Sequence, residues 1–118
     1  MGIAMTEKAP GQSEMDGARA ILVAALRSAA AGQSSSVKTL YDMTSAKLFG
    51  ICIRICPDRE AAEDVLQDVY VKIWRRAGTF DPARASPISW MAVIARNAAL
   101  DWCRREARHC ATASEDQA

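Results

Sequence analysis

The chain lacks any long apolar run and any surplus of charge of one sign. No stretch of its 118 residues approaches the roughly 18 apolar residues that a membrane-spanning helix needs. The N-terminal residues MGIAMTEKAPGQSEMDG have no apolar core of the kind that a secretory signal requires. The formal net charge is only +1, which indicates neither a basic nucleic-acid binder nor an acidic partner. These absences favour a cytoplasmic protein without membrane insertion, whose electrostatic function depends on local segregation of charge.

The CxxC pairs that are usual in zinc sites are also missing. Cys52 and Cys56 lie one helical turn apart, and a metal site could combine them with Cys103, Cys110 or the single histidine, His109. We favour the simpler interpretation, in which Cys52 is a small core residue and the others are incidental. Nothing indicates secretion, so no disulfide framework is expected. No base–nucleophile pair supports an enzyme, and we expect neither a metal nor another cofactor.

Alternation of the β-strand type is absent, and the periodic segments are helical. Residues 1–15 are polar, with Gly, Pro and Ser, and are predicted to be disordered. Apolar residues at three- and four-residue steps predict helices over about 16–31, 37–55, 59–76 and 87–105. The residues predicted to be buried are Ile21, Leu22, Ala25 and Ala29 in the first helix, Val37, Leu40, Tyr41, Thr44, Leu48, Ile51, Cys52 and Ile55 in the second, Ala62, Val65, Leu66, Val69 and Ile73 in the third, and Met91, Ile94, Ala95, Ala98 and Trp102 in the fourth. The fold class is therefore all-α, a compact bundle of three to four helices.

Cap and breaker residues mark where these helices begin and end. Ser36 can cap the second helix, and Pro57 ends it because a residue before proline avoids helical angles. Asp58 can cap the third helix. Ser86 followed by Pro87 is a cap followed by proline at the first helical position, which predicts the start of the fourth.

The third predicted helix carries a mixed face opposite its core stripe. That face holds Asp64, Gln67, Asp68 and Val71, with Trp74 at its edge. Apolar groups inside a polar rim are typical of a protein-binding patch, although an ordinary mixed surface fits equally well. The acidic start and basic end of the helix complement its dipole, so that part of the pattern requires no functional interpretation.

The fourth predicted helix carries Trp90, Asn97 and Arg104 at seven-residue intervals, with Arg96 beyond the core stripe. Aromatic, amide and guanidinium groups on one helix suit nucleic acid, because they stack on bases, read base edges and neutralise phosphate. A basic helix end that complements its dipole, with Trp90 anchoring the loop, accounts for the same residues, and the residues alone slightly favour this second interpretation.

Three segments together resemble region 2 of bacterial extracytoplasmic-function (ECF) sigma factors. These are small RNA polymerase subunits of the sigma-70 superfamily that confer promoter specificity. The segments are YDMTSAKLFGICIRI, DREAAEDVLQDVYVKIWRRAGTFDP and SPISWMAVIARNAALDWCRR, and the resemblance covers about residues 18–108. It implies a sigma region 2 helical domain over 16–108. Residues 109–118 would begin the interdomain linker of a truncated chain from which the second, minus-35-binding domain is absent.

The resemblance also assigns the surfaces. The third helix would dock on the clamp coiled coil of the largest subunit of core RNA polymerase. The implied polymerase-binding residues are Asp64, Gln67, Asp68, Val71 and Trp74. The following loop and the fourth helix would bind promoter DNA as the single-stranded non-template minus-10 element, with a flipped-out base held in a pocket, and would help to melt it. The implied DNA-binding residues are Asp81, Arg84, Ser86, Ile88, Trp90, Arg96, Asn97 and Arg104.

Family members are commonly inhibited by an anti-sigma factor, which the resemblance implies as a further partner. An alternative from a different class remains open. The chain could be a helical interaction module that binds polymerase or a regulator without contacting DNA. Such a module would not need Trp90, Asn97 and Arg104 aligned on one helix, so their alignment favours the sigma factor.

Overall fold

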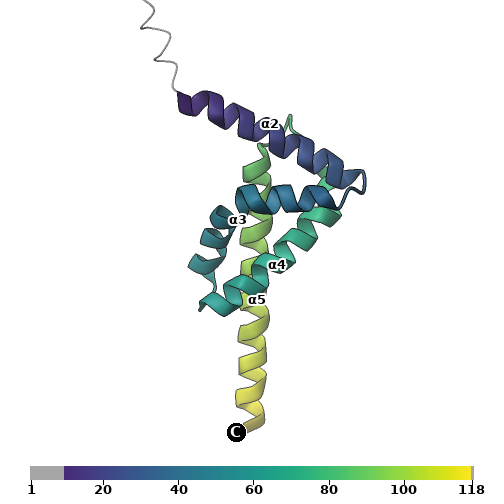
Figure 1. Cartoon of the computed structure of the whole chain (residues 1–118). Coiled ribbons are helices and arrows are strands. Elements are labelled where there is room, and N and C mark those ends of the chain that lie inside the picture. Colours follow the sequence, from purple (N-terminus) through teal and green to yellow (C-terminus); the bar gives the residue numbers. More distant parts are fainter. Residues whose placement is uncertain (1–9, 118) are drawn as a thin grey trace, which may run out of the picture.

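The computed structural model describes the backbone of residues 10–117 and the side chains of residues 14–108. Its elements, in chain order, are the helices α2 (Pro10–Ala30), α3 (Ser35–Ile55) and α4 (Arg59–Arg76), the short 3-10 helix η1 (Ala77–Thr79), and the helix α5 (Pro87–Gln117). Every regular element in that part of the chain is helical, which confirms the all-α prediction. Figure 1 shows α2 crossing one end of the bundle, while α5 runs along its length and projects beyond the other helices.

The two outer helices are longer than predicted. Helix α2 begins at Pro10, so residues 10–15 are helical rather than a disordered tail, whereas residues 1–9 lie outside the described residues. Helix α5 continues to Gln117, although the apolar periodicity predicted an end near Arg105 and a linker from residue 109. No Gly or Pro follows Pro87, and Ala, Arg and Glu favour helix, so α5 can continue where its packed face has ended.

Two of the three predicted helix caps form. The Asp58 Oδ1 accepts a hydrogen bond from the Ala61 amide at 2.8 Å, and the Ser86 Oγ accepts one from the Ser89 amide at 3.2 Å. The prediction for Ser36 was wrong, because α3 already begins at Ser35. The Ser36 hydroxyl donates instead to the carbonyl oxygen of Gln33 in the preceding turn.

The core lies where α3, α4 and α5 pack together, and α2 covers one end of it. All five predicted residues of α4 are buried, as are all those of α5 except the partly exposed Trp102. Two predictions were wrong: Ile21 is 50% exposed, and Tyr41 is also exposed. Leu26, which the prediction omitted, is fully buried. Helix α2 packs through a stripe of Leu22, Ala25, Leu26 and Ala29, so Ile21 falls outside its packed face.

A buried hydroxyl pair joins α3 to α4. Thr44 Oγ1 donates to the carbonyl oxygen of Leu40 at 2.5 Å and lies 2.6 Å from the Tyr70 hydroxyl, which must therefore donate to Thr44. Burial raises the pKa of Tyr70 to about 12, so its hydroxyl keeps the proton that this bond needs. A threonine that bonds to the carbonyl four residues earlier often bends a helix, and Figure 1 shows α3 bent in its middle.

Removing the acceptor of this hydrogen bond should lower the free energy of unfolding more than removing its donor. Thr44→Val removes the acceptor and leaves the buried Tyr70 hydroxyl unpaired, so we expect a loss of about 1–3 kcal/mol in the free energy of unfolding. Tyr70→Phe leaves Thr44 still bonded to Leu40, and should cost only about 0.5–1.5 kcal/mol. Urea titrations monitored by circular dichroism measure both values. A larger loss for Tyr70→Phe than for Thr44→Val would contradict the arrangement.

Candidate functional site

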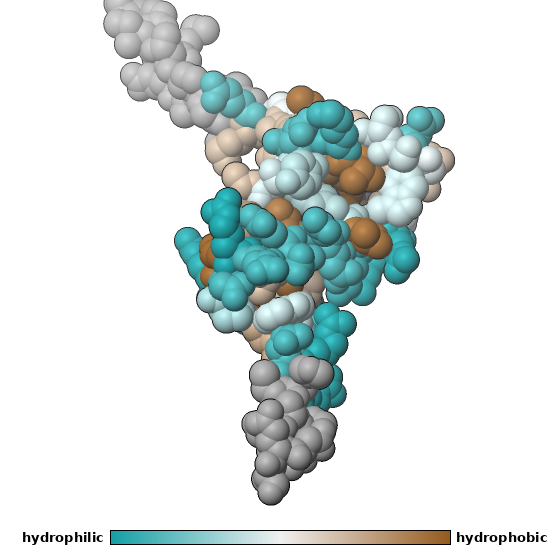
Figure 2. Space-filling model, turned by 60° about the horizontal axis from the view of Figure 1, so that its bottom comes forward, coloured by the Kyte–Doolittle hydropathy of each residue, from teal (hydrophilic) through white to brown (hydrophobic). Residues whose placement is uncertain are grey.

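The outward side of α4 forms a mixed surface that we call the α4 face, made of Asp64, Gln67, Asp68, Val71 and Trp74. The first four are exposed, at the spacing that places residues on one side of a helix. Val71 is 44% exposed, whereas Trp74 is partly buried and packs against the core. In the view of Figure 2, apolar side chains are separated by hydrophilic ones rather than joined in one patch. The α4 face therefore offers a small apolar centre inside a polar rim.

The carboxylates of the α4 face are available to a partner. Asp68 Oδ2 lies 3.1 Å from Lys72 Nζ one turn along the helix, and Asp64 makes no ion pair with any residue whose side chain is described. About half of the Asp68 side chain is exposed, and ion pairs of this kind contribute at most about 1 kcal/mol. Asp68 can therefore exchange Lys72 for a cation on a docking protein at small cost.

The loop between η1 and α5 is held by hydrogen bonds between its own residues. Asp81 Oδ1 accepts a hydrogen bond from the Ala83 amide at 2.9 Å, and the Asp81 carbonyl accepts one from the Arg84 amide at 3.0 Å. Phe80 packs edge-on against Trp90, with ring centroids 5.4 Å apart. The Trp90 indole thus anchors the loop to the first turn of α5, and the Asp81 carboxylate is already used within the loop.

A hollow of about 390 Å³ lies beside the first half of α5; we call it the α5 hollow. It is lined by Arg76, Thr79, Ala85, Ser89, Trp90, Val93, Ile94 and Asn97. Two of the predicted DNA-binding residues, Trp90 and Asn97, therefore lie at one cavity. Val93 is 58% exposed there, which gives the hollow an apolar side next to the Asn97 amide.

The remaining predicted residues lie elsewhere. Ser86 and Ile88 line a separate depression of about 480 Å³ between α2, α3 and the start of α5. Asp81, Arg84, Arg96 and Arg104 are exposed but do not line the α5 hollow. Several residues of that hollow, among them Arg76, Thr79, Ser89 and Val93, are absent from the predicted DNA-binding residues. The spacing of Ser89, Val93 and Asn97 at four-residue steps was the signal that could have found them on one face.

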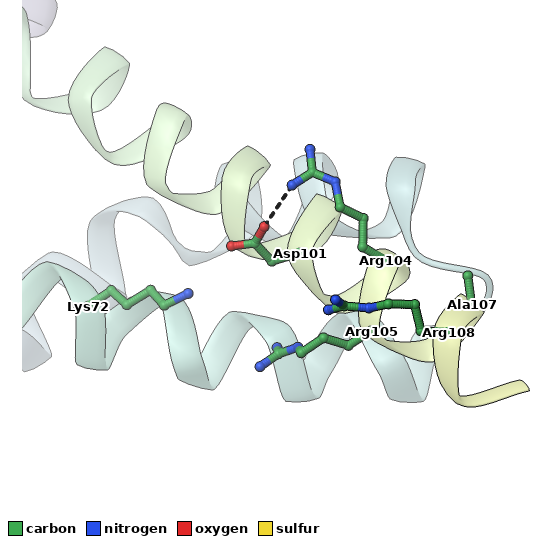
Figure 3. A pocket seen from close by; sticks show the side chains of 6 residues that line it. All are labelled: Lys72, Asp101, Arg104, Arg105, Ala107 and Arg108. Atoms are coloured by element: carbon green, nitrogen blue, oxygen red, sulfur yellow. Dashed lines mark hydrogen bonds and ion pairs between the residues drawn. The ribbon is translucent and has the colours of Figure 1, made fainter. Parts of the chain in front are cut away.

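Basic side chains from two helices meet near the other end of the described part of α5. This basic hollow, of about 560 Å³, is lined by Lys72, Asp101, Arg104, Arg105, Ala107 and Arg108. Figure 3 shows the Lys72 ammonium and the Arg105 and Arg108 guanidinium groups extending toward the same space between α4 and α5. Arg104 Nη1 pairs with Asp101 Oδ1 at 3.0 Å. The hollow is lined by four cationic side chains and one carboxylate, and Lys72 also pairs with Asp68 of the α4 face. The cations still outnumber the carboxylates, which gives this end of the molecule a local positive potential that the net charge of +1 conceals.

Neither a membrane span nor a metal cluster is found among the described residues. No helix there is both long and apolar enough to cross a bilayer. No three side chains among the described His, Cys, Asp and Glu residues gather as metal ligands. His109 and Cys110, which the sequence offered as further ligands, lie outside the described side chains.

Comparison with known proteins places the chain in a family. Residues 40–109 match the family model described as sigma-70 region 2, and the chain belongs to that family. Its relatives agree with the resemblance to ECF sigma factors. It is 35% identical over 81 residues to the ECF RNA polymerase sigma factor SigK of Mycobacterium sp. (strain KMS), which covers 69% of this chain and 42% of the relative.

The SigK protein of Mycolicibacterium vanbaalenii is 36% identical over 85 residues, covering 72% of this chain and 43% of the relative. That of Mycobacterium tuberculosis (strain ATCC 25177 / H37Ra) is 32% identical over 85 residues, covering 72% of this chain and 46% of the relative. The chain thus spans less than half the length of these curated relatives.

Proposed function

We propose that the chain is the region 2 domain of an ECF-type RNA polymerase sigma factor, a binding domain rather than an enzyme. It holds core polymerase through the α4 face and the opened minus-10 strand through the α5 hollow. The observation that carries this proposal is that two packed helices, α4 and α5, present two chemically different surfaces. One presents an apolar residue inside a rim of carboxylates, and the next presents an apolar and amide-lined hollow with a basic hollow further along.

The α4 face suits a helical, basic partner such as the clamp coiled coil of the largest polymerase subunit. Val71 supplies the apolar contact at its centre, and Asp64 and Asp68 supply carboxylates for cations around it. Burial of an apolar centre within a polar rim is the usual anatomy of a protein interface. Charge complementarity across the rim would set the orientation of the docked helices more than the affinity.

The α5 hollow suits an unpaired base taken out of the stack. The Asn97 amide can donate to and accept from a base edge, and Val93 and Trp90 offer apolar and aromatic contact. The basic hollow lies on the same helix, with Arg104 seven residues beyond Asn97, and can neutralise backbone phosphates. Sequence preference then arises at the α5 hollow, and sequence-independent affinity arises at the basic hollow.

The DNA side of this proposal predicts two different kinds of loss. Asn97→Ala should weaken binding of the preferred single-stranded oligonucleotide by roughly 10-fold, and should flatten the preference among sequences, since it removes a base contact. Arg105→Ala should weaken binding to all sequences alike and lessen its salt dependence, because it removes a phosphate contact. Fluorescence anisotropy at low salt, with a panel of short labelled single strands, measures both effects.

Val71→Asp is the matched control, since it changes the α4 face and should leave oligonucleotide binding unaltered. The alternative function, a polymerase-binding module without a DNA role, predicts no difference between wild type and Asn97→Ala. Failure of the folded wild-type chain to bind any single strand at low salt would likewise contradict the DNA side of the proposal.

We also propose an anti-sigma factor as a partner, which rests on family resemblance. Such an inhibitor must cover Val71 or the face of α5 that carries Asn97, because these are the surfaces used by polymerase and DNA. If Val71→Asp abolished polymerase binding but left the inhibitor complex intact, the inhibitor would have to occupy α5.

A further inference from the structure

Two cysteines from different helices meet where α3 ends. Cys103 on α5 directs its thiol at the carbonyl oxygen of Ile55, with Sγ and oxygen 3.5 Å apart. Cys56 follows Ile55 and is the C-cap residue of α3. Its backbone amide donates a hydrogen bond to the Cys52 carbonyl oxygen at 2.8 Å. The Cys103 thiol therefore lies against the backbone next to Cys56, and it interacts with the Cys56 thiol. The proposed function uses neither residue.

The three described thiols differ in their exposure to solvent. Cys52 is fully buried, Cys56 is 6% exposed, and Cys103 is partly exposed at the surface of α5. Burial raises the pKa of Cys56, and the neighbouring Cys103 thiol raises it further. Burial also raises the pKa of Cys52 to about 11. An oxidant from solution therefore reaches Cys103 first, while Cys56 is placed to react second and Cys52 is protected.

We propose that Cys56 and Cys103 form a redox-sensitive thiol pair, which closes an intramolecular disulfide when the chain meets a small disulfide oxidant. The Cys103 thiolate attacks one sulfur of the oxidant, forms a mixed disulfide and releases one thiolate. The Cys56 thiolate then attacks the Cys103 sulfur and releases the second thiolate. Two protein thiols are oxidised, one oxidant disulfide is reduced to two thiols, and the two protons pass to the released thiolates.

The disulfide would hold the connection between α3 and α4 against α5. Cys56, Pro57 and Asp58 connect α3 to α4, and Asp58 caps α4. A covalent link to Cys103 ties this connection, and thus the start of α4, to α5. It also closes residues 56–103 into a loop and restricts the unfolded chain, which should stabilise the oxidised domain.

Oxidised glutathione, added to the folded chain at mildly alkaline pH, tests the pair. Every sample carries Cys110→Ser, so that the remaining thiols are the three described ones. We expect the intact mass to fall by about 2 Da, the loss of two hydrogen atoms. Trypsin cleaves after Lys47, Arg54, Arg59, Arg96 and Arg104, so the three cysteines fall in separate peptides, 48–54, 55–59 and 97–104. The non-reduced digest should contain 55–59 linked to 97–104.

Matched variants separate this pair from general oxidation. Cys52→Ala should retain the link, whereas Cys103→Ser should form neither the link nor a mixed disulfide on Cys56. Oxidation should raise the thermal midpoint on the order of 10 °C in the Cys110→Ser chain and not in the Cys103→Ser variant. Linkage through Cys52, a mixed disulfide on Cys103 that never closes, disulfide-linked dimers, or thiols that stay unreacted in the folded chain would each overturn the proposal.

Discussion

Val71→Asp should reduce binding of the chain to the isolated clamp coiled coil of its polymerase by at least about 30-fold, a loss of roughly 2 kcal/mol or more. The substitution places a carboxylate at the apolar centre of the α4 face, where docking would remove it from water. Asp64 and Asp68 on the same face already carry negative charge and would pair with the cations of the partner. The added carboxylate would therefore be buried without a cationic partner. Isothermal titration calorimetry with the coiled coil measures the change.

Val93→Asp provides the matched control for this experiment. It makes the same chemical change at an exposed valine, 58% exposed against 44% for Val71, but on α5. Because both positions are exposed, neither variant should unfold the domain. Val93→Asp should keep clamp binding and lose single-strand binding at the α5 hollow. Wild-type clamp affinity in Val71→Asp, or an equal loss in both variants, would remove the α4 face as the polymerase contact.

Leu26→Ala should lower the free energy of unfolding by about 2–5 kcal/mol, a large part of the stability of a small domain. Leu26 is fully buried where α2 packs on the rest of the bundle, and alanine would leave a cavity there. Helix α2 precedes residues 40–109, which match the family model. The result therefore shows whether α2 unfolds with the family core as one cooperative unit. Chemical denaturation with coincident fluorescence and circular dichroism transitions is the measurement.

Ile21→Ala on the same helix is the control for Leu26→Ala. Ile21 belongs to the stripe predicted from the sequence but is 50% exposed, so its truncation should change stability by no more than about 0.5 kcal/mol. Both substitutions introduce alanine into the same helix. Alanine has the highest helix propensity, so neither change should destabilise the helix itself. A larger loss for Ile21→Ala than for Leu26→Ala would mean that α2 packs through the face predicted from the sequence.

The candidate site could be predicted in part because its two helices carry their functional residues on single faces. Asp64, Gln67, Asp68 and Val71 share one side of α4 through helical spacing alone, and all four are exposed. The loop was less predictable. Asp81 is engaged in its own turn, and Ser86 and Ile88 face α2 and α3 rather than the α5 hollow. Those positions depend on how the loop folds back against other helices, for which the local pattern holds no signal.

Elements whose causes are local could be predicted from the amino-acid sequence without any knowledge of the tertiary structure. Apolar periodicity and the Asp58 cap predicted α4 over the residues where it is found, and Ser86 with Pro87 predicted where α5 begins. These features depend on residues within about one or two turns of each other, so a linear pattern contains them.

Contacts between residues of different helices depend instead on how the helices pack. Their packing buried Leu26 in place of Ile21, paired Thr44 with Tyr70, and brought Lys72 of α4 to the arginines of α5. It also placed Cys103 against the end of α3. Each of these outcomes depends on how one helix crosses another, which is decided by side-chain packing between segments distant in the chain. Periodicity identifies the apolar side of a helix, but the neighbouring helices select which of its residues become buried.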